Sequence, residues 1–165
     1  MRSIRFALLS SAVVLAACGG GEKKADAAKA PEAAPAAAAP AAAAPAGGVA
    51  PITGTTHEVK MIGDASGYKF EPAAITVKAG DGIKFTFVSG GPHNVAIDPA
   101  AVPADVKSAL DANFGADKMG ELSSKMLLNA GESTTISFGG IKAGVYEFHC
   151  TPHLAMNMKI KVTVQ

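Results

Sequence analysis

Apolar and polar residues alternate in short stretches along the chain after Gly54. In residues 83–87 the odd-numbered positions are Ile or Phe and the even-numbered ones are Lys or Thr, so an extended chain carries its apolar side chains on one face. Eight segments have this alternation or are rich in β-branched and aromatic residues, and we expect each to form a strand: 57–62, 68–70, 74–78, 83–88, 93–97, 133–138, 145–150 and 158–164.

Turn-forming residues separate these segments. Gly63-Asp64, Gly90-Gly91-Pro92 and Gly139-Gly140 each interrupt the alternation with residues that favour tight turns. One interruption, residues 103–113, has apolar residues at helical spacing and predicts a helix within a longer excursion that ends near Leu128. Many short strands joined by glycine-rich turns predict an all-β sandwich or barrel with a short helical excursion.

The charge balance limits the classes of function. The chain has 165 residues and a formal net charge of +1, which excludes a dedicated nucleic-acid-binding protein because such proteins carry a basic excess. Residues 49–165 contain ten Lys and no Arg against six Asp and five Glu, a net charge of −1, so the positive surplus lies upstream. This part of the chain is long enough for one compact domain and too short for two.

The first 17 residues have the layout of a secretory signal peptide, with Arg2 and Arg5 before an apolar run that is too short to span a bilayer. The run ends in Leu15-Ala16-Ala17-Cys18, which resembles the bacterial lipobox, in which the cysteine receives a diacylglycerol and becomes the mature N-terminus. An ordinary signal peptide with an incidental cysteine is the alternative. We expect lipidation at Cys18, an extracytoplasmic, periplasmic location, and attachment to a membrane through the lipid.

An Ala/Pro-rich segment follows. Residues 25–46 comprise 15 Ala, four Pro and three charged residues, a composition that cannot build a core. The prolines recur every four or five residues and remove amide donors that a helix needs, so the segment is expected to be a disordered, partly extended tether. The expected organisation is a signal peptide over 1–17, a lipidated cysteine and linker over 18–52, and a folded domain over 53–165.

Residues that bind metal ions cluster near the C-terminus. Cys150 and His153 lie in Cys-Thr-Pro-His, Met156 and Met158 follow, and His93 lies far upstream in Gly-Pro-His-Asn. A thiolate, two imidazoles and a thioether suit copper, because soft sulfurs favour Cu(I) and imidazoles serve both Cu(I) and Cu(II). Each residue alone is better explained as an ordinary buried or solvated side chain. Their joint spacing predicts one copper site.

Five motifs support a more specific interpretation: Tyr68-Lys69-Phe70-Glu71-Pro72, Ala79-Gly80-Asp81, Gly91-Pro92-His93-Asn94, Leu-Leu-Asn-Ala-Gly-Glu over 127–132, and Tyr-Glu-Phe-His-Cys-Thr-Pro-His over 146–153. Together they resemble the cupredoxin family, most closely its plastocyanin type, over nearly all of residues 69–164. The resemblance implies an eight-stranded Greek-key β-sandwich and a type 1 (blue) copper centre with His93, Cys150 and His153 as strong ligands. It also implies a one-electron carrier and not an enzyme.

Two methionines compete for the weak axial position of such a site. Met158 lies five residues after His153, the plastocyanin spacing, whereas Met156 lies three residues after it, which resembles the shorter amicyanin loop. Strand phase does not separate the two, because both positions are even-numbered. The run from Met158 to the C-terminus matches the plastocyanin pattern, so Met158 is the expected ligand. Asn94 resembles the family residue that ties the two ligand loops together, with its backbone amide facing the cysteine sulfur.

The other His and Met residues receive structural interpretations. His149 neighbours Cys150 in a strand and therefore faces away from it, so we expect His149 at the surface. His57 has no partner motif and is expected to be structural or exposed. The three remaining methionines after the first residue are expected to pack in the core: Met61, Met119 and Met126.

The resemblance also implies how partners bind. In the family the imidazole edge corresponding to His153 reaches the surface within an apolar patch, here Pro92, Leu154, Ala155 and Met156. We expect a monomer that makes small, transient contacts there with redox proteins such as cytochromes or membrane electron-transfer complexes. The strongly acidic patch of plant plastocyanins is diluted here, because residues 98–125 carry three Lys beside five acidic residues.

Four other functions fit part of the pattern. A copper-delivery or storage protein is expected to have exposed Met or Cys clusters, and not a single Cys with spaced His residues. An enzyme with Cys150 as its nucleophile is disfavoured, because no acyl-transfer motif surrounds Cys150 in this sequence. A structural zinc site is disfavoured because the thioether suits copper better. A binding module with a vestigial site is the fourth. Intense blue colour on titration with Cu(II) separates the carrier from the delivery, hydrolytic and zinc alternatives.

Overall fold

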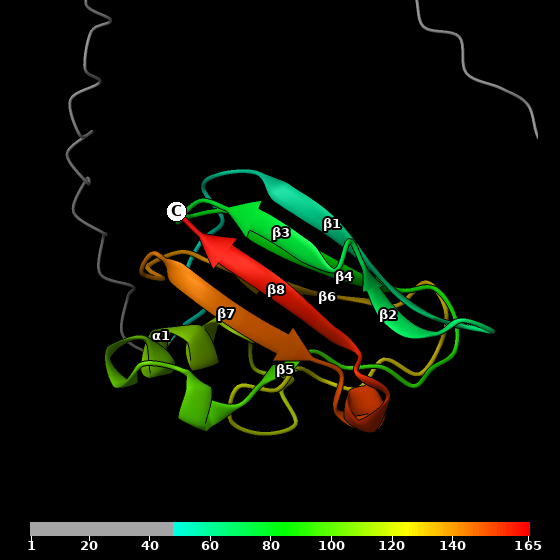
Figure 1. Cartoon of the computed structure of the whole chain (residues 1–165). Helices are drawn as coiled ribbons and strands as arrows, with labels where there is room; N and C mark the ends of the chain where they lie inside the picture. The colour runs from blue at the N-terminus through cyan, green and yellow to red at the C-terminus, as the bar shows by residue number, and fades with distance from the viewer. Residues whose placement is uncertain (1–47) are drawn as a thin grey trace, which may run out of the picture. The chain divides into compact units, whose positions relative to one another are not determined.

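The computed structural model describes residues 48–165, which form two four-stranded sheets packed face to face (Figure 1). The expected signal peptide, the lipobox cysteine Cys18 and the linker up to residue 47 lie outside the described residues. Within residues 48–165, no helix has the length and apolar character needed to cross a membrane.

The first sheet has the order β2-β1-β4-β6. Strand β1 pairs antiparallel with β2 and parallel with β4, and β4 pairs antiparallel with β6. The bounds are β1 Thr56–Asp64, β2 Gly67–Glu71, β4 Gly82–Phe87 and β6 Ser133–Ser137.

The second sheet has the order β3-β8-β7-β5. Strand β8 pairs parallel with β3 and antiparallel with β7, which in turn pairs antiparallel with β5. The bounds are β3 Ala74–Val77, β5 Ala96–Ile97, β7 Gly144–His149 and β8 Lys159–Val164. The expected eight-stranded all-β sandwich is confirmed.

One expected strand is much shorter than the sequence suggests. Residues 93–97 contain only the two-residue β5, and His93 forms an isolated bridge with Leu127. The backbone groups of His93 bond to Leu127 in both directions, at 3.0 and 2.8 Å, so this part of the chain pairs with a loop and not with the second sheet. Pairing with β7 begins only at Ala96.

Alternation along the strands produces the core between the sheets. Ile83 and Phe85 of β4 are fully buried, as are Ile160 and Val162 of β8, while Lys84 remains partly exposed on the outer face. Phenylalanine rings pack edge-on within the interior: Phe70 with Phe85 of the same sheet at 5.8 Å between centroids, and Phe138 with Phe148 at 6.1 Å. Such edge-on aromatic contacts add to the hydrophobic stabilisation from burial.

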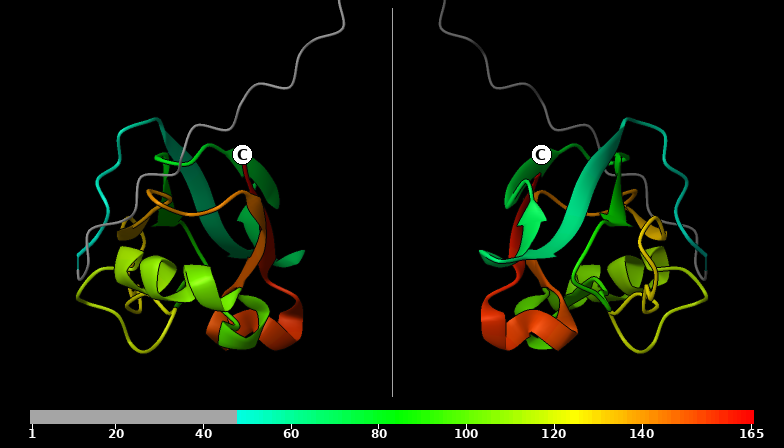
Figure 2. Two further views of the ribbon diagram at one scale, coloured as in Figure 1. Left: turned by 90° about the vertical axis from the view of Figure 1, so that its left-hand side faces the viewer. Right: turned by 90° about the vertical axis from the view of Figure 1, so that its right-hand side faces the viewer.

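The helical excursion lies below β7 in Figure 1 and below the strands in both views of Figure 2. It begins with the 3-10 turn η1, Pro99–Ala101, and continues as the helix α1, Ala104–Asn113, close to the expected helix. Val106 and Leu110 of α1 are buried one turn apart, which places one helix face against the core. Among the expected core methionines, Met61 is buried and Met126 partly buried, but Met119 is 61% exposed, so that expectation was wrong for Met119.

The last residue of α1 fixes the segment that enters the domain. Asn113 is fully buried, accepts a hydrogen bond from the Ala50 N–H at 2.8 Å and donates one to the Gly139 carbonyl at 3.1 Å. Ala50 itself is 3% exposed and packs against Gly139. Packing therefore begins at Ala50, three residues before the expected domain start at residue 53.

The entering segment lies at the same end of the sandwich as the C-terminus. The backbone amides of Thr53 and Gly54 both donate to the Gly80 carbonyl at 2.9 Å, and the neighbouring Ala79 N–H donates to the Gln165 carbonyl at 3.1 Å. Strand β8 runs from Lys159 at the other end to this one, as Figure 1 shows. The entering segment is therefore separated from the start of β8 by the length of that strand.

Asp81 links the entering segment to the turn before β4. Its carboxylate accepts hydrogen bonds from the Thr55 N–H at 2.8 Å and the Lys78 N–H at 3.0 Å, and it lies 2.9 Å from Nε2 of His57. These contacts lower the pKa of Asp81 from 3.8 to about 2, with the Lys78 amide as the largest cause and His57 next. The sequence analysis expected His57 to be either structural or exposed, and its contact with Asp81 gives it a structural role.

We predict that Asp81→Asn makes the free energy of unfolding less dependent on pH under acidic conditions. The pKa of Asp81 in the fold lies below its unfolded value, so the ionised carboxylate stabilises the fold above about pH 4, and this contribution is lost as the pH falls towards 2. Between about pH 4 and pH 2, the free energy of unfolding measured by urea denaturation should fall by about 1–2 kcal/mol more for the wild type than for Asp81→Asn. Asp117→Asn, at an exposed carboxylate, serves as the control and should behave as the wild type. Equal pH profiles for wild type and Asp81→Asn would contradict the assignment.

Candidate metal centre

Three donor atoms meet at the end of the sandwich where β7 stops and β8 starts. His93 comes from the loop after β4, Cys150 follows β7 directly, and His153 lies in the 3-10 segment η2, Thr151–Met156. Sγ of Cys150 lies 3.5 Å from Nδ1 of His93 and 3.4 Å from Nδ1 of His153. The three side chains could thus hold a single metal ion.

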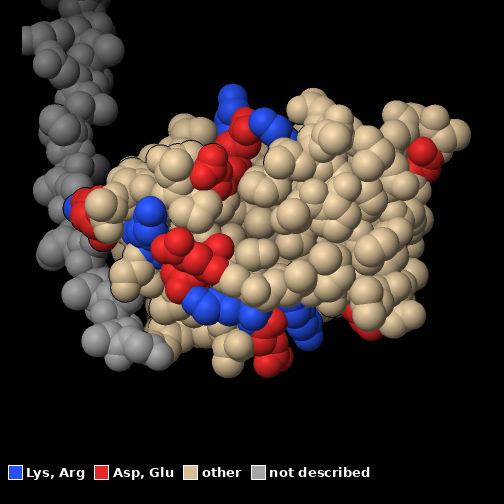
Figure 3. Space-filling model, turned by 90° about the horizontal axis from the view of Figure 1, so that it is seen from below, with Lys and Arg blue, Asp and Glu red and all other residues tan. Residues whose placement is uncertain are grey.

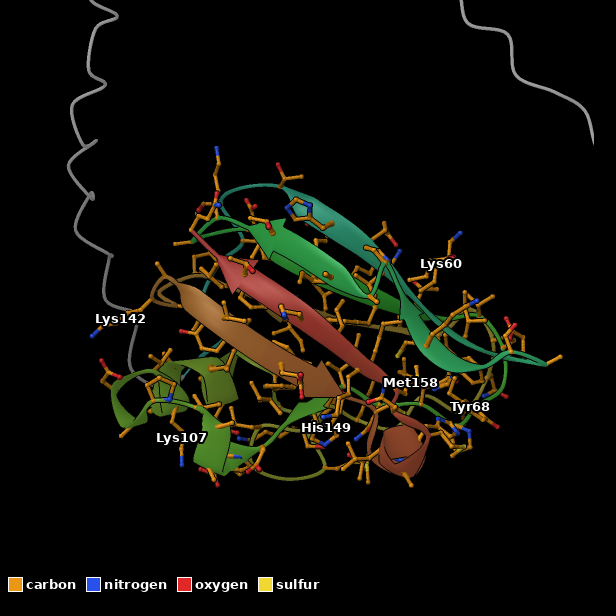
Figure 4. The ribbon with its side chains drawn as sticks, viewed as in Figure 1. Lys60, Tyr68, Lys107, Lys142, His149 and Met158 are labelled. Atoms are coloured by element: carbon orange, nitrogen blue, oxygen red, sulfur yellow. The ribbon has the colours of Figure 1, made fainter. Side chains whose placement is uncertain are left out.

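The phase of β7 directs the thiol inward. Tyr146 and Phe148 are buried and Glu147 is exposed, so Cys150 continues the inward series and is fully buried. His149 lies on the other face of the strand and is half-buried, away from the three donors. In Figure 4 it lies at the end of β7. His149 therefore points away from the metal site, as expected.

Burial separates the two candidate methionines where strand phase did not. Met158 is fully buried, whereas Met156 is 48% exposed. The Met158 backbone is bonded to both donor segments: its N–H donates to the His153 carbonyl at 3.2 Å and its carbonyl accepts from the Cys150 N–H at 3.0 Å. Asn157, between Met156 and Met158 in the sequence, has a left-handed backbone conformation with a φ of 60° and ends η2.

The His93 imidazole is oriented by its second nitrogen. Nε2 lies 2.9 Å from the Ser89 carbonyl, which can only accept a hydrogen bond, so Nε2 carries the proton. Nδ1 then faces Cys150 with a free lone pair, the form in which an imidazole binds a metal ion. The Phe87 ring makes a T-shaped contact with the same imidazole, with 4.9 Å between centroids.

Asn94 ties the two donor loops together, as the resemblance implied. Its side-chain oxygen accepts from the Thr151 N–H at 2.7 Å, and its amide nitrogen donates to the hydroxyls of Thr151 at 3.1 Å and Ser123 at 3.2 Å. Because Asn94 follows His93 and Thr151 follows Cys150, these bonds fix the two metal-facing residues relative to one another.

Burial shifts the pKa of each of the three donors in the direction that favours its uncharged form. It raises the pKa of the Cys150 thiol, although the backbone N–H groups of Asn94 and His153 act in the opposite direction. It lowers the pKa of His93, against the effect of the Ser89 hydrogen bond, and lowers that of His153, which His93 lowers further. A neutral thiol must lose its proton when it binds a metal ion, so binding is coupled to proton release.

The donor set fits copper. Two imidazole nitrogens and one thiolate, with a thioether nearby, combine ligands that serve both Cu(I) and Cu(II). A closed zinc site would use four strong nitrogen, sulfur or carboxylate ligands, whereas the only grouping of three or more such residues within 48–165 is this one.

Comparison with known proteins agrees with the donor chemistry. The profile of the plastocyanin/azurin family, described as copper binding proteins, matches residues 57–165. The chain belongs to this family. Its cofactor is one copper ion of type 1.

Individual plastocyanins align over the described domain. The chloroplastic plastocyanin of Tetradesmus obliquus is 43% identical over 108 residues, 65% of this chain and 66% of that protein. The plastocyanin of Rumex obtusifolius is 38% identical over 109 residues, 66% of this chain and 99% of the relative. The oxidised plastocyanin of Dryopteris crassirhizoma superposes with a TM-score of 0.51 at 35% identity, over 66% of this chain and 99% of the other.

Two features of this plastocyanin-like site were not identified from sequence. The Tyr68 ring stacks on the His153 imidazole with centroids 3.7 Å apart, although Tyr68 entered the sequence analysis only as part of a motif. The Ser89 carbonyl, which orients His93, is a backbone group four residues upstream. The sequence placed Tyr68 in a strand, but gave no signal that its ring would meet His153. Nothing in the sequence marks the Ser89 carbonyl.

We predict that Asn94→Ala weakens copper binding about ten- to hundredfold, because it removes the hydrogen bonds that hold the two donor loops together. Competition with a chelator of known affinity measures the change. Ser123→Ala is the matched control, since it removes only the longest of these bonds and should cost no more than about threefold. Equal losses in the two variants would show that Asn94 does not hold the loops.

Proposed function

We propose that this protein is a one-electron carrier. Its copper would be held by Nδ1 of His93, Sγ of Cys150 and Nδ1 of His153, with the thioether of Met158 as a weak fourth ligand. The observation that carries the proposal is the convergence of three buried donors from two separate loops at one end of a rigid sandwich. A bound copper ion supplies the chemistry, a one-electron exchange between Cu(I) and Cu(II).

The protein residues favour electron exchange over metal transfer. The donors are anchored by backbone and side-chain hydrogen bonds, so the same ligands can serve both oxidation states. All three are buried, and the most accessible of them, His153, is only 6% exposed. A copper-delivery or storage protein would exchange its metal with a partner through accessible ligands, which these side chains do not provide. No substrate site is required, so we propose a carrier and not an enzyme.

An apolar surface surrounds the His153 edge. Leu154 and Met156 of η2 are 43% and 48% exposed, and Pro92, next to the ligand His93, is also exposed. Seen from below in Figure 3, the acidic and basic side chains gather at the left and centre, while the right-hand part, at the η2 end, is almost free of them. We propose that redox partners such as cytochromes or membrane electron-transfer complexes bind here transiently, to a monomeric protein.

The entry point of the chain suits an anchored carrier. The segment from Ala50 to Thr55 is fixed at the end opposite the donors, so a linker attached there leaves the apolar surface accessible. We propose that Cys18 is lipidated and holds the protein on the periplasmic side of a membrane. The lipobox-like sequence Leu15-Ala16-Ala17-Cys18 supports this proposal.

Copper reconstitution tests the carrier function. Metal-free protein titrated with one equivalent of Cu(II) should turn intensely blue, and the blue protein should show a reversible one-electron wave by voltammetry. Cys150→Ala, which keeps a buried apolar side chain in place of the thiol, should remain folded and colourless. A colourless wild type, or a blue protein that cannot be reduced and reoxidised, would contradict the proposal.

The two methionines provide a matched pair of variants. Met158→Leu should retain the blue colour and raise the reduction potential, because the weak axial donor tunes the potential. Met156→Leu removes a thioether that is exposed and should leave the potential unchanged. Both potentials come from voltammetry of the reconstituted proteins. A shift in Met156→Leu with none in Met158→Leu would reverse the axial assignment.

We predict that Cys18→Ser moves the protein from the membrane to the soluble fraction, because the modified thiol is the proposed anchor. Fractionation of cells and immunoblotting measure the distribution. Cys150→Ser is the control, since it removes the other cysteine and should leave the membrane fraction unchanged. Retention of Cys18→Ser in the membrane would refute the lipid anchor.

A further inference from the structure

The two imidazoles of the metal centre are held in different ways. Nε2 of His93 bonds to the Ser89 carbonyl, which fixes the plane of that ring. The hydrogen bonds found within residues 48–165 include none to Nε2 of His153, whose Nδ1 faces Cys150. Rotation of the His153 ring is therefore not limited by a second hydrogen bond.

An aromatic ring lies against the face of the His153 imidazole. The Tyr68 ring lies parallel to the His153 imidazole, with 3.7 Å between centroids and 17° between planes. The contact of His93 with His153 is edge-on, at 4.8 Å and 62°. Among the described aromatic contacts of His153, only that of Tyr68 is stacked. In Figure 4, Tyr68 lies at the end of the sandwich where β8 starts.

The hairpin of β1 and β2 is built to accept this ring. Tyr68 pairs with Gly63 across the hairpin, and a Cβ atom at Gly63 would lie 2.6 Å from Cε1 of Tyr68. It would also lie 2.8 Å from the Cα of Gly90, so the backbone offers no room for a larger residue. The absence of a side chain at position 63 therefore allows the Tyr68 ring to lie where it does.

The ring, and not the hydroxyl, makes the relevant contact. The Tyr68 hydroxyl has no hydrogen-bond partner in the described part of the chain, whereas the ring face is in van der Waals contact with the imidazole. A flat apolar face placed parallel to an imidazole resists tilting of that imidazole. The same face restricts the access of water to one side of it.

We propose that Tyr68 is the positioning residue for His153. Its stacked ring takes the place of the hydrogen bond that orients His93, and it keeps the His153 plane fixed in both oxidation states. The electron then passes through an imidazole that does not reorient. This proposal rests on the proposed ligation of copper by His153.

Two variants at position 68 separate the ring from its hydroxyl and from simple packing. Tyr68→Phe keeps the stacked face, while Tyr68→Leu keeps an apolar side chain but removes the face. In the metal-free protein, NMR relaxation of the His153 ring should show a rigid imidazole in wild type and Tyr68→Phe, and a mobile one in Tyr68→Leu. In the copper protein, Tyr68→Leu should change the electron paramagnetic resonance spectrum and lower copper affinity by about tenfold, with Tyr68→Phe within about twofold of wild type.

The possible results distinguish the two proposals. A blue Tyr68→Leu protein with the spectrum, affinity and rigid His153 of the wild type would overturn the positioning role and leave the carrier function intact. Equal effects of Tyr68→Phe and Tyr68→Leu would assign the role to the hydroxyl and would also overturn it. A wild-type protein that never turns blue would refute the carrier function itself.

Discussion

A buried thiol held within 3.5 Å of two imidazole nitrogens is the constraint on which the arrangement of this domain depends. Three polar groups removed from water are costly unless each has a partner. Here the partners are one another, the Ser89 carbonyl and the backbone amides around the thiol. A bound cation can replace the contacts among the donors, because the bonds of the Ser89 carbonyl and of the Asn94 side chain do not involve the metal-facing atoms.

The two sheets supply the rigidity that this arrangement needs. Strand β7 delivers the thiol, β8 begins directly after Met158, and interlocked rings such as Phe138 and Phe148 fill the space between the layers. Asn94 then fastens the loop after β4 to the loop that joins β7 and β8. The chain enters at the opposite end, where Asp81 secures it. In the proposed function, attachment and electron exchange use different ends of the domain.

Period-two alternation was sufficient to locate the strands, because each strand has one buried face. It failed for residues 93–97, since the backbone of His93 pairs with a loop residue, Leu127, that carries no strand pattern. The spacing of Cys150 and His153 identified two donors, because local sequence fixes a short loop. The spacing after His153 and the run to the C-terminus favoured Met158 over Met156 by resemblance, and burial in the structure favours the same residue.

Contacts that depend on register between distant segments were beyond the reach of the sequence. The Tyr68–His153 stack requires the β1–β2 hairpin to lie against η2, and the His57–Asp81 pair requires β1 to lie beside the turn before β4. Neither arrangement follows from a single sequence, because no local pattern defines which segments become neighbours. The resemblance to cupredoxins identified the donor residues but not the contacts that orient them.

Crystal structures of the metal-free, Cu(I) and Cu(II) proteins test the central claim most directly. The account predicts that the Cys150 Sγ atom and the Nδ1 atoms of His93 and His153 occupy the same positions in all three, within about 0.5 Å. The claim would be contradicted by a metal-free protein in which these atoms lie far apart and come together only when copper is added.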